Sequence, residues 1–262
     1  MTLLQADNLN LSFGGLQVLH DISFSVDDGE IFAIIGPNGA GKTSILNCLG
    51  GFYLQDHGTI RLDGQDISSL SPDRRAAMGM ARTFQNIALF RGMTVLDNIK
   101  LGAHSYLQTG LLAAAFYWGS AHREEMRLRA EIEDKIIDFL EIEHIRKQPV
   151  SALAYGLQKR VELARALAMR PRVLLMDEPV AGMNAEETED MARFILDIQE
   201  EWGITIIIIE HDIHMVMDIS NRVMVVNFGQ EITTGTPESV QSHPEVIKAY
   251  LGTKQAVAAG NS

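Results

Sequence analysis

Runs of apolar residues separated by polar segments are the main structural signal along this chain. Near-continuous apolar runs at 31–35, 173–176 and 204–209 are typical of strands that are buried on both faces of a parallel sheet. Polar residues follow each run directly, as expected where such strands end at the edge of a sheet. The pattern therefore predicts an α/β core built on a mainly parallel sheet.

Shorter alternating patterns predict antiparallel strands. Apolar positions alternate with polar ones at 3–6, 9–13 and 22–26, as they do in half-buried strands. The segment 58–64 is expected to form a strand that ends in an Asp-Gly turn, and 223–233 a hairpin near the C-terminus.

A glycine-rich stretch directly after the first apolar run fits the phosphate-binding pattern G-x-x-x-x-G-K-[ST]. The stretch consists of Gly36, Pro37, Asn38, Gly39, Ala40, Gly41, Lys42 and Thr43, and Ser44 continues it into an expected helix. Its glycines allow backbone N–H groups to turn inward around phosphate oxygens at the positive end of that helix. Lys42 would reach the β- and γ-phosphates of ATP, and the Thr43 hydroxyl would ligate Mg²⁺. A glycine turn that matches by chance is the alternative.

Polar side chains at the ends of the two later runs are predicted to meet this loop. Asp177 and Glu178 follow one run and His211 follows the other, and the carboxyl ends of parallel strands share one edge of a sheet. Asp177 is placed to hold Mg²⁺, directly or through water. Glu178 would act as general base toward an attacking water, and His211 would bridge that water and the γ-phosphate.

A helical region divides the predicted core. Residues 124–146 carry apolar positions at helical spacing among many charges, and about 86–167 reads as a helical insertion. We expect one domain over 1–262, with the nucleotide-binding core in 1–85 and 168–262 and a flexible tail at 253–262. The predicted fold class is an α/β P-loop NTPase core with a mainly parallel sheet, an N-terminal antiparallel β subdomain and an inserted helical subdomain.

Composition limits the classes of partner and of site that the chain can have. A formal net charge of −12 argues against nucleic acid as a partner, because such binding needs a basic face. With one cysteine, Cys48, the chain has no intrachain disulfide and no cysteine zinc cluster. No cleavable signal is visible, and the apolar run 111–118 is too short to span a bilayer. We expect a cytosolic protein in which that run is either core or a contact surface.

The segment Leu153–Leu167, together with the glycine loop and the acids after the 173–176 run, resembles the ATP-binding cassette (ABC) family, and the resemblance extends from about Leu3 to Leu251. It implies that Ala154, Tyr155, Gly156 and Leu157 form the family signature, whose helix N-terminus faces the γ-phosphate held by a second cassette.

The same resemblance implies further roles. Gln85 matches the glutamine that senses Mg²⁺ and the membrane partner, His211 the switch histidine, and Asn184 belongs to the loop that touches the opposite cassette. Phe13 matches the aromatic residue that stacks on adenine, although its alternating pattern alone favours a place in the core.

Three residues depart from the family pattern. Ala154 replaces the signature serine, Leu157 the usual glutamine and Asn184 the usual aspartate. The contact with the partner's γ-phosphate would therefore depend on backbone N–H groups.

The chain is similar to the cassettes of branched-chain amino-acid importers and their urea and amide relatives in its signature at 153–156 and in the segments 82–85, 89–95, 235–237 and 249–252. This implies a peripheral ATPase subunit at the cytoplasmic face of the inner membrane. Its partners would be a second cassette, identical or paralogous, two membrane-spanning permease subunits and, indirectly, a periplasmic substrate-binding protein. The alternatives are a soluble ABC-type ATPase acting on ribosomes or DNA, a small-molecule kinase that uses the same loop, and a module that binds ATP without cleaving it.

Overall fold

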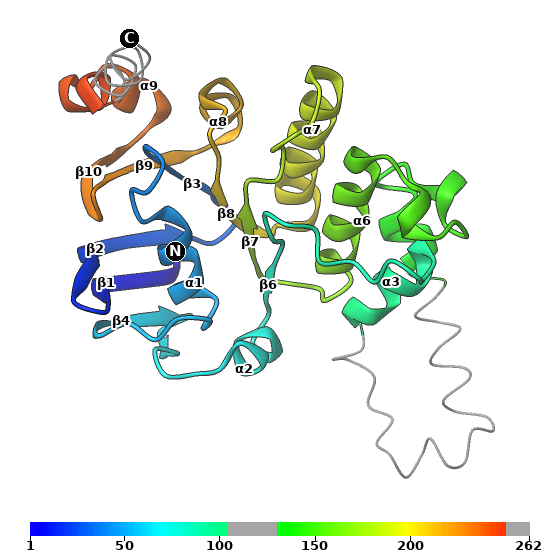
Figure 1. The fold of residues 1–262 in the computed structure, drawn as a ribbon, viewed down its shortest axis with the longest axis horizontal. Coiled ribbons are helices and arrows are strands. Elements are labelled where there is room, and N and C mark those ends of the chain that lie inside the picture. Colours follow the sequence, from blue (N-terminus) through cyan, green and yellow to red (C-terminus); the bar gives the residue numbers. More distant parts are fainter. Residues whose placement is uncertain (104–129, 131, 250–262) are drawn as a thin grey trace.

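Two β-sheets and the helices around them make up the structure (Figure 1), a computed structural model that describes residues 1–103, 130 and 132–249. The strand order is β2-β1-β4-β5 in the first sheet and β10-β9-β3-β8-β7-β6 in the second. The first sheet is antiparallel, and the second is parallel except for its edge strand β10. This confirms the predicted α/β fold class.

The antiparallel sheet is built from the N-terminal part of the chain. Its strands are β1 (Thr2–Phe13), β2 (Leu16–Asp27), β4 (His57–Leu62) and β5 (Gln65–Asp66). The patterns at 3–6 and 9–13 belong to one long strand, not to two. The register of β1 against β2 shifts between Ala6 and Leu9, where Asn8 has a φ of 50°, and this irregularity interrupts the alternation.

The six-stranded sheet contains all three apolar runs. Its strands are β3 (Ile31–Ile35), β6 (Met80–Arg82), β7 (Val173–Asp177), β8 (Thr205–Ile209), β9 (Arg222–Asn227) and β10 (Gln230–Gly235). Strands β3, β8 and β7 are hydrogen-bonded neighbours in parallel register, so their carboxyl ends lie along one edge. Strands β9 and β10 form the predicted hairpin.

Helices pack on both faces of this sheet. They are α1 (Lys42–Leu49), α2 (Pro72–Ala77), α3 (Val95–Gly102), α6 (Tyr155–Leu167), α7 (Ala185–Trp202), α8 (Ile213–Ile219) and α9 (Pro237–Gln241), with short turns η2 (Ile132–Ile137), η3 (Glu143–Ile145) and η4 (Val150–Ala152). Among the residues described, no helix combines the length and the apolar character that crossing a membrane requires.

The helical spacing over 124–146 does not correspond to one continuous helix in the part that the structure describes. From residue 132 onward the chain forms a π-helical turn, η2, and a 3₁₀ turn, η3, and between them Glu141 has a φ of 57°. This reversal still buries Ile142 and Ile145, so tight turns satisfy the same apolar spacing as a helix. Residues 124–129 and 131 and the expected tail at 253–262 lie outside the described residues.

The six-stranded sheet separates two apolar cores. Ile31, Ala33 and Ile35 of β3 pack on one side with residues of α3, α6, α7 and α8. Phe32 and Ile34 pack on the other side with α1 and the antiparallel sheet. Helix α1 therefore lies between the two sheets. Its Cys48 is buried, and burial raises the pKa of the thiol to about 11.

A buried arginine closes the C-terminal end of α1. The Arg75 guanidinium donates to the carbonyl oxygens of Cys48 and Leu49 at 2.6 and 2.7 Å, and to those of Leu70 and Ser68 at 3.0 Å each. The last carbonyls of a helix have no partner within it. The Cys48 carbonyl also accepts from the Gly51 N–H at 3.2 Å, so it is the Leu49 carbonyl that depends on Arg75 most.

We predict that Arg75→Met lowers the free energy of unfolding by roughly 3 kcal/mol, because buried carbonyl oxygens lose their donors. The neighbouring Arg74 is exposed, and Arg74→Met should change stability by less than roughly 0.5 kcal/mol. Chemical denaturation of both variants measures the difference. Equal stability of the two variants would contradict this account of α1.

Candidate functional site

The glycine loop after β3 turns directly into helix α1. Gly36 lies so close to β9 that a Cβ atom there would be 2.0 Å from the carbonyl oxygen of Val226. Gly41 precedes the helix with a φ of 99°, a conformation that glycine adopts most readily. Both glycines are therefore required by the local geometry, which aims the first N–H groups of α1 at the space above the loop.

A pocket of about 710 Å³ lies above this loop. It is lined by Val18, Asn38, Gly39, Ala40, Gly41, Lys42, Thr43, Ser44, Gln85, Glu178 and His211. The structure thus brings the predicted loop residues together with side chains from the ends of β7 and β8. Gly36, Pro37 and Asp177 are not among the lining residues, and Asp177 is almost fully buried.

Lys42 is folded back onto its own loop. Its Nζ donates to the carbonyl oxygens of Gly36 at 2.8 Å and of Pro37 at 2.9 Å. Burial lowers the pKa of the ammonium group, and the charges of Glu178 and Asp177 oppose that shift. An anion that enters the pocket would offer this cation a partner of opposite charge in place of two neutral carbonyls.

The Glu178 carboxylate lies between two polar side chains. Gln85 Nε2 donates to Oε2 at 2.9 Å, and His211 Nε2 lies 2.6 Å from Oε1. Glu178 itself has a φ of 50°, and its N–H donates to the carbonyl oxygen of Ile209 at the end of β8. A non-glycine residue in this conformation stores strain, which is characteristic of functional positions. The bond to β8 thus fixes the backbone of Glu178, and Gln85 and His211 hold its side chain.

Asp177 has one oxygen bound and the other without a partner. Its Oδ2 accepts from Arg82 Nη2 at 2.9 Å, whereas the buried Oδ1 has no hydrogen-bond partner. Burial raises the pKa of this carboxyl, and Arg82 opposes the shift. A buried carboxylate oxygen without a donor, together with the exposed hydroxyl of Thr43, fits a hard cation such as Mg²⁺.

The rest of a metal's coordination would have to come from elsewhere. Among the described residues, no group of three or more His, Cys, Asp or Glu side chains is arranged to hold a metal ion. Phosphate oxygens and water would therefore complete such a site, as is usual for Mg²⁺.

The residues that resemble the family signature form the start of α6. None of them lines the pocket above the glycine loop, which is called the nucleotide pocket below. Ala154 is the N-cap and offers no side-chain hydrogen bond, so the first N–H groups of α6 lack a side-chain acceptor there. Tyr155 is 43% exposed, and Leu157 packs against the apolar core. The glutamine that is usual in the family is thus replaced by a residue with a packing role.

The segment around Asn184 lies against this helix start. Asn184 caps α7 by accepting from the Glu187 N–H, and the Glu187 side chain accepts from the Asn184 N–H in return. A Cβ atom on Gly156 would lie 2.3 Å from the Glu187 carboxylate, and one on Gly182 would touch the Tyr155 ring at 3.3 Å. The start of α6 and the loop before α7 thus form one continuous surface.

Helix α6 also holds the backbone around Gln85. Lys159 Nζ donates to the carbonyl oxygens of Phe84 and Gln85 at 3.3 and 2.9 Å. Glu162 Oε1 accepts from the N–H groups of Phe84 and Ala88 at 3.4 and 3.3 Å. Both side chains are buried; burial lowers the pKa of Lys159 and raises that of Glu162. The signature helix and the Gln85 loop are therefore connected by buried, charge-assisted hydrogen bonds.

The interpretation of Phe13 as core, drawn from its alternating pattern, is wrong. Phe13 is the last residue of β1 and is 46% exposed, with its ring edge-on to Tyr53 at 5.1 Å between centroids. It does not line the pocket, where Val18 of β2 is the apolar residue nearest the chain start.

Sequence reasoning assigned no role to several charged residues that support the site. They are Arg82, Lys159, Glu162 and Glu210. Glu210 is buried, burial raises its pKa, and it accepts from the N–H groups of Val180 and His211 at 2.8 and 2.9 Å. Glu210 thus joins the loop after Glu178 to the loop that carries His211. In the sequence, the role of Glu210 is indicated only by its position directly after a predicted strand.

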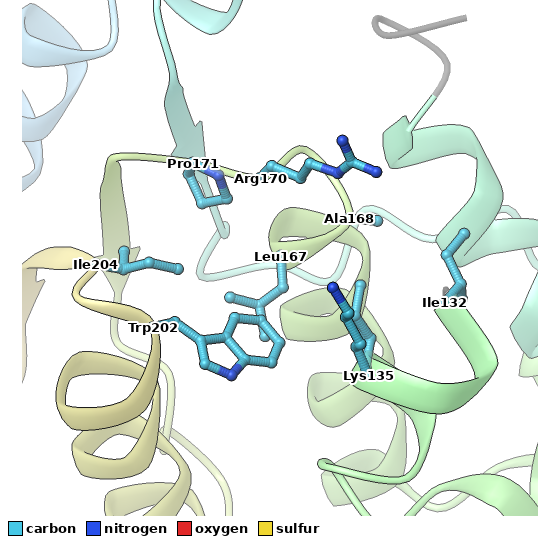
Figure 2. Close-up of a pocket in the computed structure, with 9 residues that line it drawn as sticks. Ile132, Lys135, Leu167, Ala168, Arg170, Pro171, Trp202 and Ile204 are labelled. Carbon is cyan, nitrogen blue, oxygen red and sulfur yellow. The ribbon is translucent and has the colours of Figure 1, made fainter. Parts of the chain in front are cut away.

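A second cavity, of about 500 Å³, lies apart from these residues (Figure 2). It is bounded by η2, the end of α6 and the end of α7, with the Trp202 indole on one side and Lys135 and Ile132 on the other. It shares no lining residue with the nucleotide pocket. Gln85, Glu178 and His211 therefore belong to the pocket above the glycine loop and not to this second cavity.

Two loop glycines give a test of the geometry. We predict that Gly36→Ala destabilises the fold by roughly 3 kcal/mol or more, since the new methyl group overlaps the Val226 carbonyl. Gly39 also has a positive φ, 78°, but nothing lies within 4 Å of an added Cβ. Gly39→Ala should therefore cost only about 1 kcal/mol of backbone strain. Denaturation curves that show equal losses would contradict the close approach at Gly36.

Comparison with known proteins agrees with this geometry. A family model described as "ABC transporter" matches residues 19–181, and one described as "Branched-chain amino acid ATP-binding cassette transporter" matches residues 230–256. The first match covers more than half of the chain, from β2 through the glycine loop and α6 to the acids after β7.

Relatives of similar length match almost the whole chain. It is 40% identical over 250 residues to the high-affinity branched-chain amino acid transport ATP-binding protein BraF of Pseudomonas aeruginosa, covering 95% of this chain and 98% of BraF. It is 41% identical over 254 residues to LivG of Escherichia coli, with the same coverage. The lipopolysaccharide export system ATP-binding protein LptB of Haemophilus influenzae is 35% identical over 252 residues, covering 96% and 98%.

Solved structures share the fold. The ADP conformation of MJ1267, an ATP-binding cassette of an ABC transporter, superposes with a TM-score of 0.83 at 32% identity, covering 96% of this chain and 99% of that one. The site, the family match and these relatives lead to one conclusion: the chain belongs to the ABC transporter family and is one of its ATP-binding cassettes.

Proposed function

We propose that this chain is the ATP-hydrolysing subunit of an importer for branched-chain amino acids. The observation that carries the proposal is the Glu178 carboxylate, which is held between Gln85 and His211 at the mouth of the phosphate-binding loop. The substrate class rests on the 40–41% identity to BraF and LivG and on the family match over 230–256. The urea and amide importers remain the alternative within the same group.

The loop and the start of α1 would bind the phosphates of ATP. Backbone N–H groups of 38–44 would surround the terminal phosphates, and Lys42 would exchange the two carbonyl partners that it has now for β- and γ-phosphate oxygens. Thr43, Asp177 and Gln85 would hold Mg²⁺, which neutralises charge on the phosphates. Phe13 is proposed to stack on the adenine, since its ring stands exposed at the end of β1.

Glu178 is proposed to act as the general base. Its carboxylate is held by two neutral or cationic donors and lies in the pocket, so it can accept a proton from a water placed in line with the γ-phosphate. His211 keeps that carboxylate in place and itself lines the pocket, where it could bond to the phosphate. Gln85 donates to Glu178 through Nε2, so its amide oxygen is the atom that could ligate a metal.

A second cassette, identical or paralogous, would complete each ATP site. The signature residues Ala154–Leu157 do not line the pocket of their own chain, and Tyr155 is exposed. The N–H groups at the start of α6 have no side-chain cap, which suits an anion presented by another molecule. Asn184 and the adjoining loop would lie in the same interface.

The proposed membrane partners are two permease subunits, with a periplasmic binding protein acting through them. Phe90 and Met93, which follow Gln85, are 56% and 39% exposed and are candidates for that contact. The second candidate, residues 104–122, lies outside the described residues. We propose accordingly that the chain is peripheral at the cytoplasmic face of the inner membrane. We also propose that about 86–167 is the helical subdomain that carries the signature.

We predict that Glu178→Gln lowers the ATP hydrolysis rate by roughly 100-fold or more, because a carboxamide cannot accept the proton. ATP affinity should change little, and unhydrolysed ATP should hold the variant as a dimer in gel filtration. Glu200→Gln, an exposed acid near the end of α7, is the matched control and should hydrolyse ATP at the parental rate. Hydrolysis by the Glu178 variant at near the parental rate would exclude this residue as the base.

Transport by a reconstituted complex tests the substrate class. The chain, its paired cassette and the two permease subunits in proteoliposomes should take up labelled leucine when ATP and the binding protein are supplied, and Glu178→Gln should abolish uptake. Uptake of urea without leucine would favour the alternative. ATPase stimulation by RNA or DNA, and none by the membrane subunits, would reject the importer.

A further inference from the structure

Arg82 is a buried cation that connects the metal-ligand candidate to two other elements. It is the last residue of β6, next to β7, and its side chain is 8% exposed. One amino group, Nη2, donates to Asp177 Oδ2 at 2.9 Å, and the other, Nη1, donates to Asn47 Oδ1 of helix α1 at 2.7 Å. A single planar group therefore holds the end of β7 against the phosphate-binding helix.

Two aromatic rings fix the plane of this guanidinium. Its Cζ lies 5.2 Å from the centroid of the Phe52 ring and 5.1 Å from that of Phe84, and the two rings meet edge-on at 5.7 Å. Both contacts are in the range of cation–π attraction. Phe84 directly precedes Gln85, so the loop that bears Gln85 is part of the same assembly.

The outer side of this assembly is a surface groove. A cavity of about 280 Å³ is lined by Phe52, Arg82 and Phe84 together with residues of α2 and β6. Phe52 is 48% exposed. The wall of the groove and the Asp177 carboxylate are thus separated by one side chain.

Arg82 and Asp177 depend on each other as a buried ion pair. Burial lowers the pKa of Arg82 and raises that of Asp177, while each charge opposes the shift of the other. Removing one member would leave the other buried without a counter-charge. Oδ2 is engaged by Arg82, and the buried Oδ1 is left without a donor. That free oxygen is the one available to a cation.

We propose that Arg82 is a positioning residue that fixes the Asp177 carboxylate for metal binding. Because Phe52 packs on the Arg82 guanidinium and lines the surface groove, the wall of the groove also influences the position of this carboxylate. The inference rests on the proposed function, because Asp177 must ligate the Mg²⁺ that accompanies the nucleotide. It adds a role for Arg82 that the activity alone does not require. Arg82 touches neither nucleotide nor water and acts only through Asp177.

The test measures metal binding separately from nucleotide binding. Mn²⁺ replaces Mg²⁺ as the probe, and electron paramagnetic resonance reports free Mn²⁺ in titrations of the protein–ADP complex. ADP affinity is measured in parallel with EDTA present. The variant is Arg82→Met, which keeps an apolar stem between the rings but has no donor. The matched control is Arg61→Met, which removes a surface arginine that pairs with Asp7 at 2.8 Å.

We expect Arg82→Met to weaken Mn²⁺ binding about tenfold and to leave metal-free ADP affinity within about twofold, since one ligand loses its orientation. Arg61→Met should change neither. Arg82→Lys keeps a cation beside Asp177 but cannot also span to Asn47, so a loss of about threefold is expected. If Arg82→Met does not fold, Arg82→Lys decides the question alone, and unchanged Mn²⁺ affinity in it overturns the proposal.

Other outcomes are equally decisive. Tighter Mn²⁺ binding in Arg82→Met would mean that Arg82 only competes with the metal, and equal losses of Mn²⁺ and metal-free ADP would mean a purely structural role. Either result overturns the proposal. Failure of the parental protein to bind Mn²⁺ with ADP would instead reject the proposed function.

The groove is tested with Phe52→Ala. This variant removes one ring from the guanidinium and leaves the Asp177 bond available, so a loss of Mn²⁺ affinity of about threefold is expected. Leu54→Ala is the control, because Leu54 is an apolar residue two positions away that is 69% exposed and does not line the groove. Equal Mn²⁺ affinity in the two variants would remove the groove from the proposal.

Discussion

The parallel register of β3, β8 and β7 is the constraint on which the rest of the structure depends. Because these strands are hydrogen-bonded neighbours, the glycine loop, His211 and Glu178 emerge at the same edge although they are far apart in the sequence. The Glu178 N–H even bonds to the last residue of β8. A slip of one residue between strands would turn side chains to the opposite face and separate these groups.

Features encoded by adjacent residues could be predicted from the sequence. The run 31–35 is β3 residue for residue, because a strand buried on both faces and a glycine loop are both specified locally. The convergence of Asp177, Glu178 and His211 on one edge could also be predicted, because parallel strands share an edge. The break in the expected helix at Glu141 could not, since turns and helices bury the same apolar spacing.

The supporting charges could not be predicted, because their partners are distant along the chain. Arg82 binds an acid 95 residues later, and Lys159 binds the carbonyl of a residue 74 positions earlier. In the sequence such residues look the same as charged residues on a solvent-exposed helix face. In the fold they are buried, and a buried charged group requires hydrogen-bond partners. Phe13 shows the converse: alternation suggested burial, but β1 ends there, at the margin of the sheet.

The state of Cys48 has a practical consequence. This thiol is enclosed between the two sheets and stays protonated near neutral pH, and it is the single cysteine of the chain. Alkylating dyes and spin labels react with thiolates, so they would attach selectively to a cysteine introduced on the surface. Distance measurements by fluorescence or double electron–electron resonance can therefore follow this cassette without first replacing a native residue.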